Sequence, residues 1–182
     1  MTHIATVGSI VIKLLKMIIN IIVLVLYRTG YGGFFLGVGG TWNLNEIKDP
    51  STEMVASGVF VGFIIYTGVS LVSYCFATGD HKNTFVDILM NIVGIFMWLA
   101  IGAVALHYWH GYLSEQRFIY VSAERQVNFL YIISAYCILK LFFFQTGLAM
   151  GSLCVINGAL YLLDSVLASA HYFKKQMMTE EE

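Results

Sequence analysis

Five stretches of this chain are apolar enough to enter a lipid bilayer, and together they fill most of its 182 residues. Charged residues make up only 12% of the sequence, and the mean hydropathy is +0.76. A water-soluble domain of this size would have too little polar surface to cover such a core. A bilayer favours runs of about 20 apolar residues and forces them into helices, because lipid cannot hydrogen-bond the backbone. The sequence therefore predicts an all-α integral membrane protein.

Four of these stretches read as membrane-spanning helices, at about residues 8–27, 54–76, 85–107 and 147–170. We expect them to form a four-transmembrane-helix bundle, a single membrane domain over residues 1–182. Polar sequence separates them and gives outer loops at residues 28–53 and 108–126, with a cytoplasmic tail at residues 171–182. Residues 30–40 are rich in glycine, and because glycine permits positive φ we expect a folded loop there.

The orientation depends on which helix ends carry lysine and arginine. If four helices span, the N-terminus, the turn at residues 77–84 and the tail share one side. That side carries Lys13, Lys16, Lys82, Lys174 and Lys175, against Arg28, Lys48, Arg117 and Arg125 on the other. The slight excess places both termini in the cytoplasm. A spanning fifth stretch, residues 127–144, would instead move the basic tail outside, against the rule, so four spans are favoured.

Ionisable residues occur inside the predicted spans. Lys13 and Lys16 share one face of the first helix with Ser9 and Asn20, at a spacing of four, three and four residues. Asp164 lies within the last helix, at a similar depth, and Asp87 starts the third. An ionisable group in lipid is costly enough to require a partner, so Lys13 or Lys16 is expected to pair with Asp164 or Asp87. Such a pair can fix helix register or belong to an ion or proton pathway, and the lysines can also simply snorkel to the interface.

Two pairs of glycines stand at the four-residue spacing that lets helix backbones approach closely. They are Gly58 and Gly62 in the second helix and Gly147 and Gly151 in the last. Packing within the bundle is one interpretation of these pairs. A face for a partner's helix, such as that of a tetraspanin, is the other.

The two outer loops offer aromatic side chains for recognition. Trp42 lies among glycines and polar residues in the first loop, and Phe118 and Tyr120 lie between opposite charges in the second. Aromatic side chains among adaptable neighbours make good contact anchors. No phosphate-binding glycine loop, metal-ligand set or nucleophile with a general base occurs, so we predict no cofactor, no metal site and no enzymatic activity. A net charge of −1 offers no basic face to nucleic acid.

Several sequence blocks together resemble one protein family. They read GGTWNLNE at residues 39–46, VASGV at 55–59, VALHYW at 104–109, SAERQ at 122–126, AMGSLCVI at 149–156 and GALYLLD at 158–164. In combination they look like the snakeskin family, arthropod four-span membrane proteins of smooth septate junctions. The resemblance covers nearly the whole chain apart from residues 127–145 and the far tail.

The resemblance implies a structural function. A member of this family would be a component of smooth septate junctions at the apicolateral plasma membrane, needed for junction assembly and for the paracellular barrier of gut epithelium. Its implied partners are a single-span protein called mesh and a tetraspanin. Association with copies of itself is also compatible with the resemblance. The alternative is a small membrane transporter or channel subunit that uses the intramembrane lysines and aspartates.

Residues 127–145 depart from the family pattern, which we expect to run from residues 124–126 almost directly into residue 147. The segment begins with Val127 and Asn128, which GTAAAT can encode, as in a splice donor. It ends with three phenylalanines and Gln145, which a pyrimidine tract followed by CAG can encode, as in a splice acceptor. We interpret the segment as a retained intron, and a fifth helix or re-entrant segment is the alternative.

Overall fold

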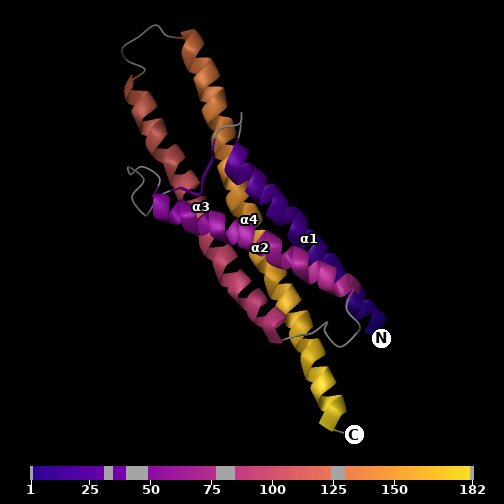
Figure 1. The fold of residues 1–182 in the computed structure, drawn as a ribbon. Coiled ribbons are helices and arrows are strands. Elements are labelled where there is room, and N and C mark those ends of the chain that lie inside the picture. Colours follow the sequence, from indigo (N-terminus) through magenta and orange to yellow (C-terminus); the bar gives the residue numbers. More distant parts are fainter. Residues whose placement is uncertain (1, 31–34, 40–48, 77–84, 124–129, 181–182) are drawn as a thin grey trace.

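The computed structural model describes residues 2–30, 35–39, 49–76, 85–123 and 130–180 (Figure 1). Within them it describes the side chains of residues 7–30, 35–39, 49–73, 85–110, 145–170 and 172–173. The described chain forms four helices, α1 (Thr2–Thr29), α2 (Pro50–Phe76), α3 (Phe85–Ala123) and α4 (Leu130–Glu180). All four are long and apolar enough to cross a membrane, which confirms the predicted all-α, four-span architecture.

The helices are arranged as an elongated bundle (Figure 1). α3 and α4 lie side by side and make the most extensive contact, while α1 packs on α4 and α2. α2 crosses the bundle at an angle, and both chain termini lie at one end of the molecule. The four candidate spans are Val7–Thr29, Pro50–Ser73, Phe85–His110 and Gln145–Ala170.

Local sequence signals fix the ends of α1 and α2. Gly30 adopts a φ of 45° and donates its backbone N–H to the carbonyl of Leu26 at 2.9 Å, which closes α1 with a left-handed cap. The carboxylate of Asp49 accepts hydrogen bonds from the backbone N–H groups of Ser51 and Thr52 at 3.3 and 3.0 Å. The bonds from Thr52 also hold the pKa of Asp49 below its usual value. Pro50 follows this cap at the first helical position, where its missing N–H costs nothing.

The distribution of side chains is that of a protein surrounded by lipid. Large apolar side chains lie exposed along the outer faces of the helices, among them Val11, Leu14, Ile18 and Val25 on α1. Polar and charged side chains, including Lys13, are buried inside. An apolar surface of this extent is incompatible with water and matches a bilayer, where outward apolar groups are already solvated.

The helices extend further than the hydropathy pattern predicts. α3 continues beyond its span at His110 to Ala123, so most of the predicted outer loop at residues 108–126 has a helical backbone, and its place outside the membrane remains a prediction. Residues 113–117 contain leucine, glutamate, glutamine and arginine, all good helix formers, and no proline interrupts them. Likewise, α4 continues through the tail as far as Glu180. Hydropathy locates where an apolar run ends, and a helix can continue past that point into water.

The segment at residues 127–145 does not form a separate fifth helix in the described structure. α4 begins at Leu130 and runs without a break through Gln145 and Thr146 into the last span. Residues 130–144 therefore prolong α4, and with the end of α3 they extend past α1 and α2 at the top of Figure 1. A second crossing of the bilayer would need a reversal of direction, and the continuous helix contains none. The intron interpretation remains a prediction.

Candidate functional site

A group of buried charged and amide side chains lies at the end of the bundle that holds both termini. It consists of Lys13 and Lys16 from α1, Asp87 and Asn91 from α3, and Asp164 from α4, and we call it the buried ion cluster. The structure thus brings together all four ionisable residues that the sequence singled out. Both lysines and Asp164 are completely buried, and the side chain of Asp87 is 12% exposed.

Asp164 is the centre of the cluster. Its Oδ2 atom accepts hydrogen bonds from the Nζ atoms of Lys16 and Lys13 at 2.5 and 3.1 Å and from Nδ2 of Asn91 at 3.2 Å. Its Oδ1 atom accepts a longer bond from the hydroxyl of Ser9 at 3.4 Å. One carboxylate of α4 therefore holds side chains of both α1 and α3, and charge-assisted bonds of this kind are about twice as strong as neutral ones.

Asp87 forms a second centre beside the first. Its Oδ2 and Oδ1 atoms accept hydrogen bonds from Nζ of Lys13 at 2.9 and 3.1 Å. The hydroxyl of Tyr66 also donates to Asp87, as does that of Ser70 at 3.4 Å. Tyr66 and Ser70 belong to α2, so the cluster and its immediate neighbours tie all four helices together.

Lys16 also has several partners inside the bundle. Its Nζ atom donates to Oδ1 of Asn91 at 3.0 Å, in addition to Asp164, and lies 4.1 Å from the centre of the Tyr161 ring. The face of an aromatic ring attracts a cation, most strongly where water is excluded. The hydroxyl of Tyr161 in turn shares a hydrogen bond of 3.0 Å with Thr67. Two lysines and two aspartates leave the cluster formally neutral, and their mutual attraction offsets part of the cost of placing charges in the bilayer.

The polar interior changes to an apolar one along the bundle. On α1 the buried Lys16 and Asn20 are followed by Val23, and on α3 the buried Asn91 is followed by Trp98. On α2, Phe60 is also fully buried, and its ring lies 5.3 Å from that of Trp98. Asn20 itself accepts a hydrogen bond from Asn157 of α4. Polar side chains thus fill the interior of the bundle near the chain termini, and packed aromatic side chains fill it further along the bundle axis.

Several members of the site were not singled out from the sequence. Asn91 lies one turn beyond Asp87, and Tyr161 and Asn157 lie three and seven residues before Asp164, so helical spacing could have located them. Tyr66 carries no such signal, because its contact with Asp87 depends on where α2 crosses the bundle.

The two glycine pairs have different surroundings. A Cβ atom at Gly147 would lie 2.3 Å from the Trp109 ring, and one at Gly151 would lie 2.9 Å from the Leu106 side chain, so both glycines form the close α3–α4 contact. Gly58 and Gly62 are exposed, and a Cβ atom on either would meet nothing within 4 Å. Packing within the bundle is therefore the wrong interpretation for the α2 pair, because α2 turns this face outward. Its use as a face for a partner's helix remains a prediction.

The predicted recognition residues fall largely beyond what the structure describes. Trp42 lies outside the described residues. Phe118 and Tyr120 belong to the helical backbone of α3, in the part that continues past the span, and their side chains are not described.

Comparison with known proteins gives two close relatives. The protein snakeskin of Drosophila melanogaster is 55% identical over 174 residues, which cover 96% of each chain. The protein snakeskin of Bombyx mori is 53% identical over 175 residues, which cover 96% of this chain and 99% of that one. No family model and no solved structure matches the chain. At this identity over almost the full length, the chain belongs to the snakeskin family.

Proposed function

We propose that this protein is a structural component of smooth septate junctions, needed for junction assembly and for the paracellular barrier of the gut epithelium. It resides in the apicolateral plasma membrane with both termini in the cytoplasm, and it acts by assembly rather than by catalysis. Its partners are other membrane proteins of the junction, one similar to mesh and one similar to a tetraspanin. Membership of the snakeskin family supports this proposal.

The observation that favours a structural function over transport is the arrangement of the buried ion cluster. Both lysines and Asp164 are fully buried and bonded within one chain. A conducting path would continue polar groups along the axis, whereas the buried positions beyond Asn20 are apolar and aromatic, including Phe60 and Trp98. The charges therefore serve to fix the four helices against one another. Fixed helices give the outer segments a constant geometry for contact with partners.

The test uses a polarised gut epithelium depleted of the endogenous protein and supplied with variants. The unchanged protein should restore transepithelial resistance and exclude a small tracer from the intercellular space. Asp164→Asn should reach the surface in smaller amounts and restore little barrier, because Lys16 then loses its only carboxylate partner in the cluster. Ser152→Ala, at an exposed position on the same helix, is the matched control and should behave as the unchanged protein.

Two results would contradict the proposal. If the unchanged protein reaches the surface but restores no barrier, the junction function is wrong. If Asp164→Asn is delivered normally but alters the flux of ions or protons across the membrane, the alternative of a transporter or channel subunit is favoured.

A further inference from the structure

Two asparagines lie inside the bundle beyond the buried ion cluster, and both are fully buried. Asn20 stands four residues beyond Lys16 on α1, and Asn157 stands seven residues before Asp164 on α4. At about 1.5 Å per residue, the two amides lie roughly 6–10 Å further along the bundle than the cluster. They therefore occupy the level at which the polar interior gives way to aromatic side chains.

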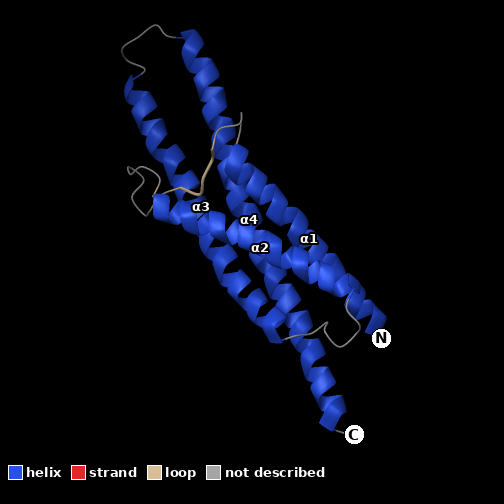
Figure 2. Cartoon of the chain, in the orientation of Figure 1, coloured by secondary structure: helices blue, strands red, loops and turns tan. Residues whose placement is uncertain are grey.

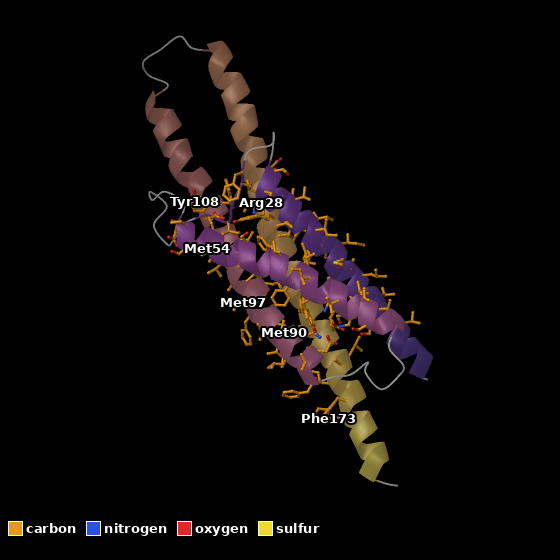
Figure 3. The ribbon with its side chains drawn as sticks, viewed as in Figure 1. Arg28, Met54, Met90, Met97, Tyr108 and Phe173 are labelled. Carbon is orange, nitrogen blue, oxygen red and sulfur yellow. The ribbon has the colours of Figure 1, made fainter. Side chains whose placement is uncertain are left out.

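This level is far from both ends of the bundle. Figure 3 shows Arg28 towards one end and Phe173 towards the other, and the loop of residues 35–39, drawn in tan in Figure 2, lies at the end of Arg28. Asn20 and Asn157 stand near the middle of their spans, Val7–Thr29 and Gln145–Ala170. In the middle of a bilayer, a polar group must find its partners inside the protein, because lipid tails offer none.

The two amides share a single hydrogen bond. Nδ2 of Asn157 donates to Oδ1 of Asn20 at 2.5 Å. No described residue pairs with the two remaining atoms, Nδ2 of Asn20 and Oδ1 of Asn157. Turning both amides over would reverse the bond and again leave one N–H group and one carbonyl oxygen unpaired. The unpaired donor and acceptor therefore do not depend on how the amides are oriented.

These two atoms define the chemistry of the group that would bind them. One is a donor and the other an acceptor, so a cation or an anion would match only one of the two. The adjacent ion cluster is formally neutral and gives no preference for either kind of ion. A water molecule can both accept and donate, and buried waters typically bind roughly two to four polar groups that would otherwise be unpaired.

A third polar group lies close to the amides. The hydroxyl of Tyr161, one turn beyond Asn157 on α4, interacts with the Asn20 amide without the geometry of a hydrogen bond. It shares a hydrogen bond of 3.0 Å with Thr67 of α2, in which either oxygen can donate. When Tyr161 donates to Thr67, its oxygen can accept a proton from a neighbouring water molecule.

We propose that a water molecule is bound between Asn20 and Asn157 and joins α1 to α4 in the middle of the bilayer. It accepts a hydrogen bond from Nδ2 of Asn20 and donates one to Oδ1 of Asn157, and its second proton is directed to the hydroxyl oxygen of Tyr161. α1 is then held to α4 at two levels, by the ion cluster and by the bridged amides. The inference rests on hydrogen bonding within the bundle, so it is independent of the proposed junction function.

A crystal structure of the full-length protein in a lipidic mesophase tests the site directly, at a resolution that reveals ordered water. We expect a peak of density within hydrogen-bond distance of both Nδ2 of Asn20 and Oδ1 of Asn157. Absence of this peak, with the two amides bonded only to each other, would overturn the proposal.

X-ray radiolysis of the protein in lipid nanodiscs provides a second test. The X-rays generate hydroxyl radicals from water, bound water included, and these radicals oxidise aromatic rings next to the place where they form. Tyr161 and Phe60 are both fully buried, so a difference between them reports water inside the bundle. After correction for the intrinsic reactivity of the two rings, mass spectrometry should show Tyr161 oxidised several-fold faster than Phe60.

The double variant Asn20→Leu/Asn157→Leu removes both amides, so no polar group of the pair is left without a partner. In this variant the oxidation rate of Tyr161 should fall to that of Phe60. Ser152→Ala, at an exposed position on the same helix, is the control and should leave the rate unchanged.

Two results of the radiolysis would overturn the proposal. One is an equal rate for Tyr161 and Phe60 in the unchanged protein, and the other is a fast Tyr161 rate that persists in the folded double variant. If the double variant does not fold, the crystal structure and the two rings of the unchanged protein still decide.

Discussion

At the scale of single residues, Asp164 holds the buried ion cluster together. It receives hydrogen bonds from Lys13, Lys16 and Asn91, whereas Lys13 also has Asp87 as a second partner. The consequences of substitution should therefore be unequal. Removing Asp164 leaves one lysine buried with no carboxylate, but removing Lys16 leaves Asp164 still paired with Lys13.

This inequality gives a double-mutant prediction. Asp164→Leu should lower the free energy of unfolding by about 3 kcal/mol, the usual cost of an uncompensated buried charge, and Lys16→Met should lower it by less. The double variant should be more stable than Asp164→Leu alone, because Lys13 and Asp87 remain as a complete pair. Unfolding of purified protein in mixed micelles measures the three changes. Simple additivity of the two single changes would show that Lys16 and Asp164 do not stabilise one another.

At the scale of helices, the two glycine pairs provide an internal comparison. Gly151→Leu should destabilise the bundle by about 1–3 kcal/mol, because the new side chain has no room beside Leu106. Gly62→Leu should leave stability within about 0.5 kcal/mol of the parent, because its face of α2 is open. Thermal unfolding in the same detergent compares the two. A large loss of stability in Gly62→Leu would contradict the outward orientation of this face, and loss of junctional delivery in a stable Gly62→Leu protein would support its use by a partner's helix.

The sequence predicts the spanning parts of the helices well and their ends poorly. Hydropathy detects lipid-facing residues, so the four spans follow from it, but α3 continues in polar sequence from His110 to Ala123 without a hydrophobic signal. A pairing of Lys13 or Lys16 with Asp164 or Asp87 was expected from their similar depth and from the cost of a charge in lipid, but the sequence did not say which lysine would meet which aspartate. The contact of Glu53 with residues 35–39 was not predictable, because it depends on the path of a glycine-rich loop between two helices.

At the scale of the whole molecule, the span of α3 ends and the span of α4 begins where the two helices are in contact. Trp109 lies at the end of the third span, one residue before His110, and a Cβ atom at Gly147 in the last span would lie 2.3 Å from its ring. The connection between them therefore begins and ends at the same place. Removal of residues 127–145 would take only Gln145 from the last span, so it is compatible with four spans.

The retained-intron interpretation can be tested on RNA. Amplification of mature transcript across the codons for Gln126 and Thr146 should give mainly a product that lacks the codons of residues 127–145. The protein without these residues should also keep its thermal stability, because the contacts of the buried ion cluster all lie elsewhere. Retention of the segment in nearly all transcripts would contradict the interpretation.

We have proposed that this protein is a four-span junction component with both termini in the cytoplasm. Immunolocalisation in a polarised gut epithelium tests it most directly, with an antibody to the tail applied before and after permeabilisation. We expect a ring at the apicolateral border that is stained only after permeabilisation. Diffuse apical staining would contradict the junction function, and staining of the tail on intact cells would contradict the four-span topology.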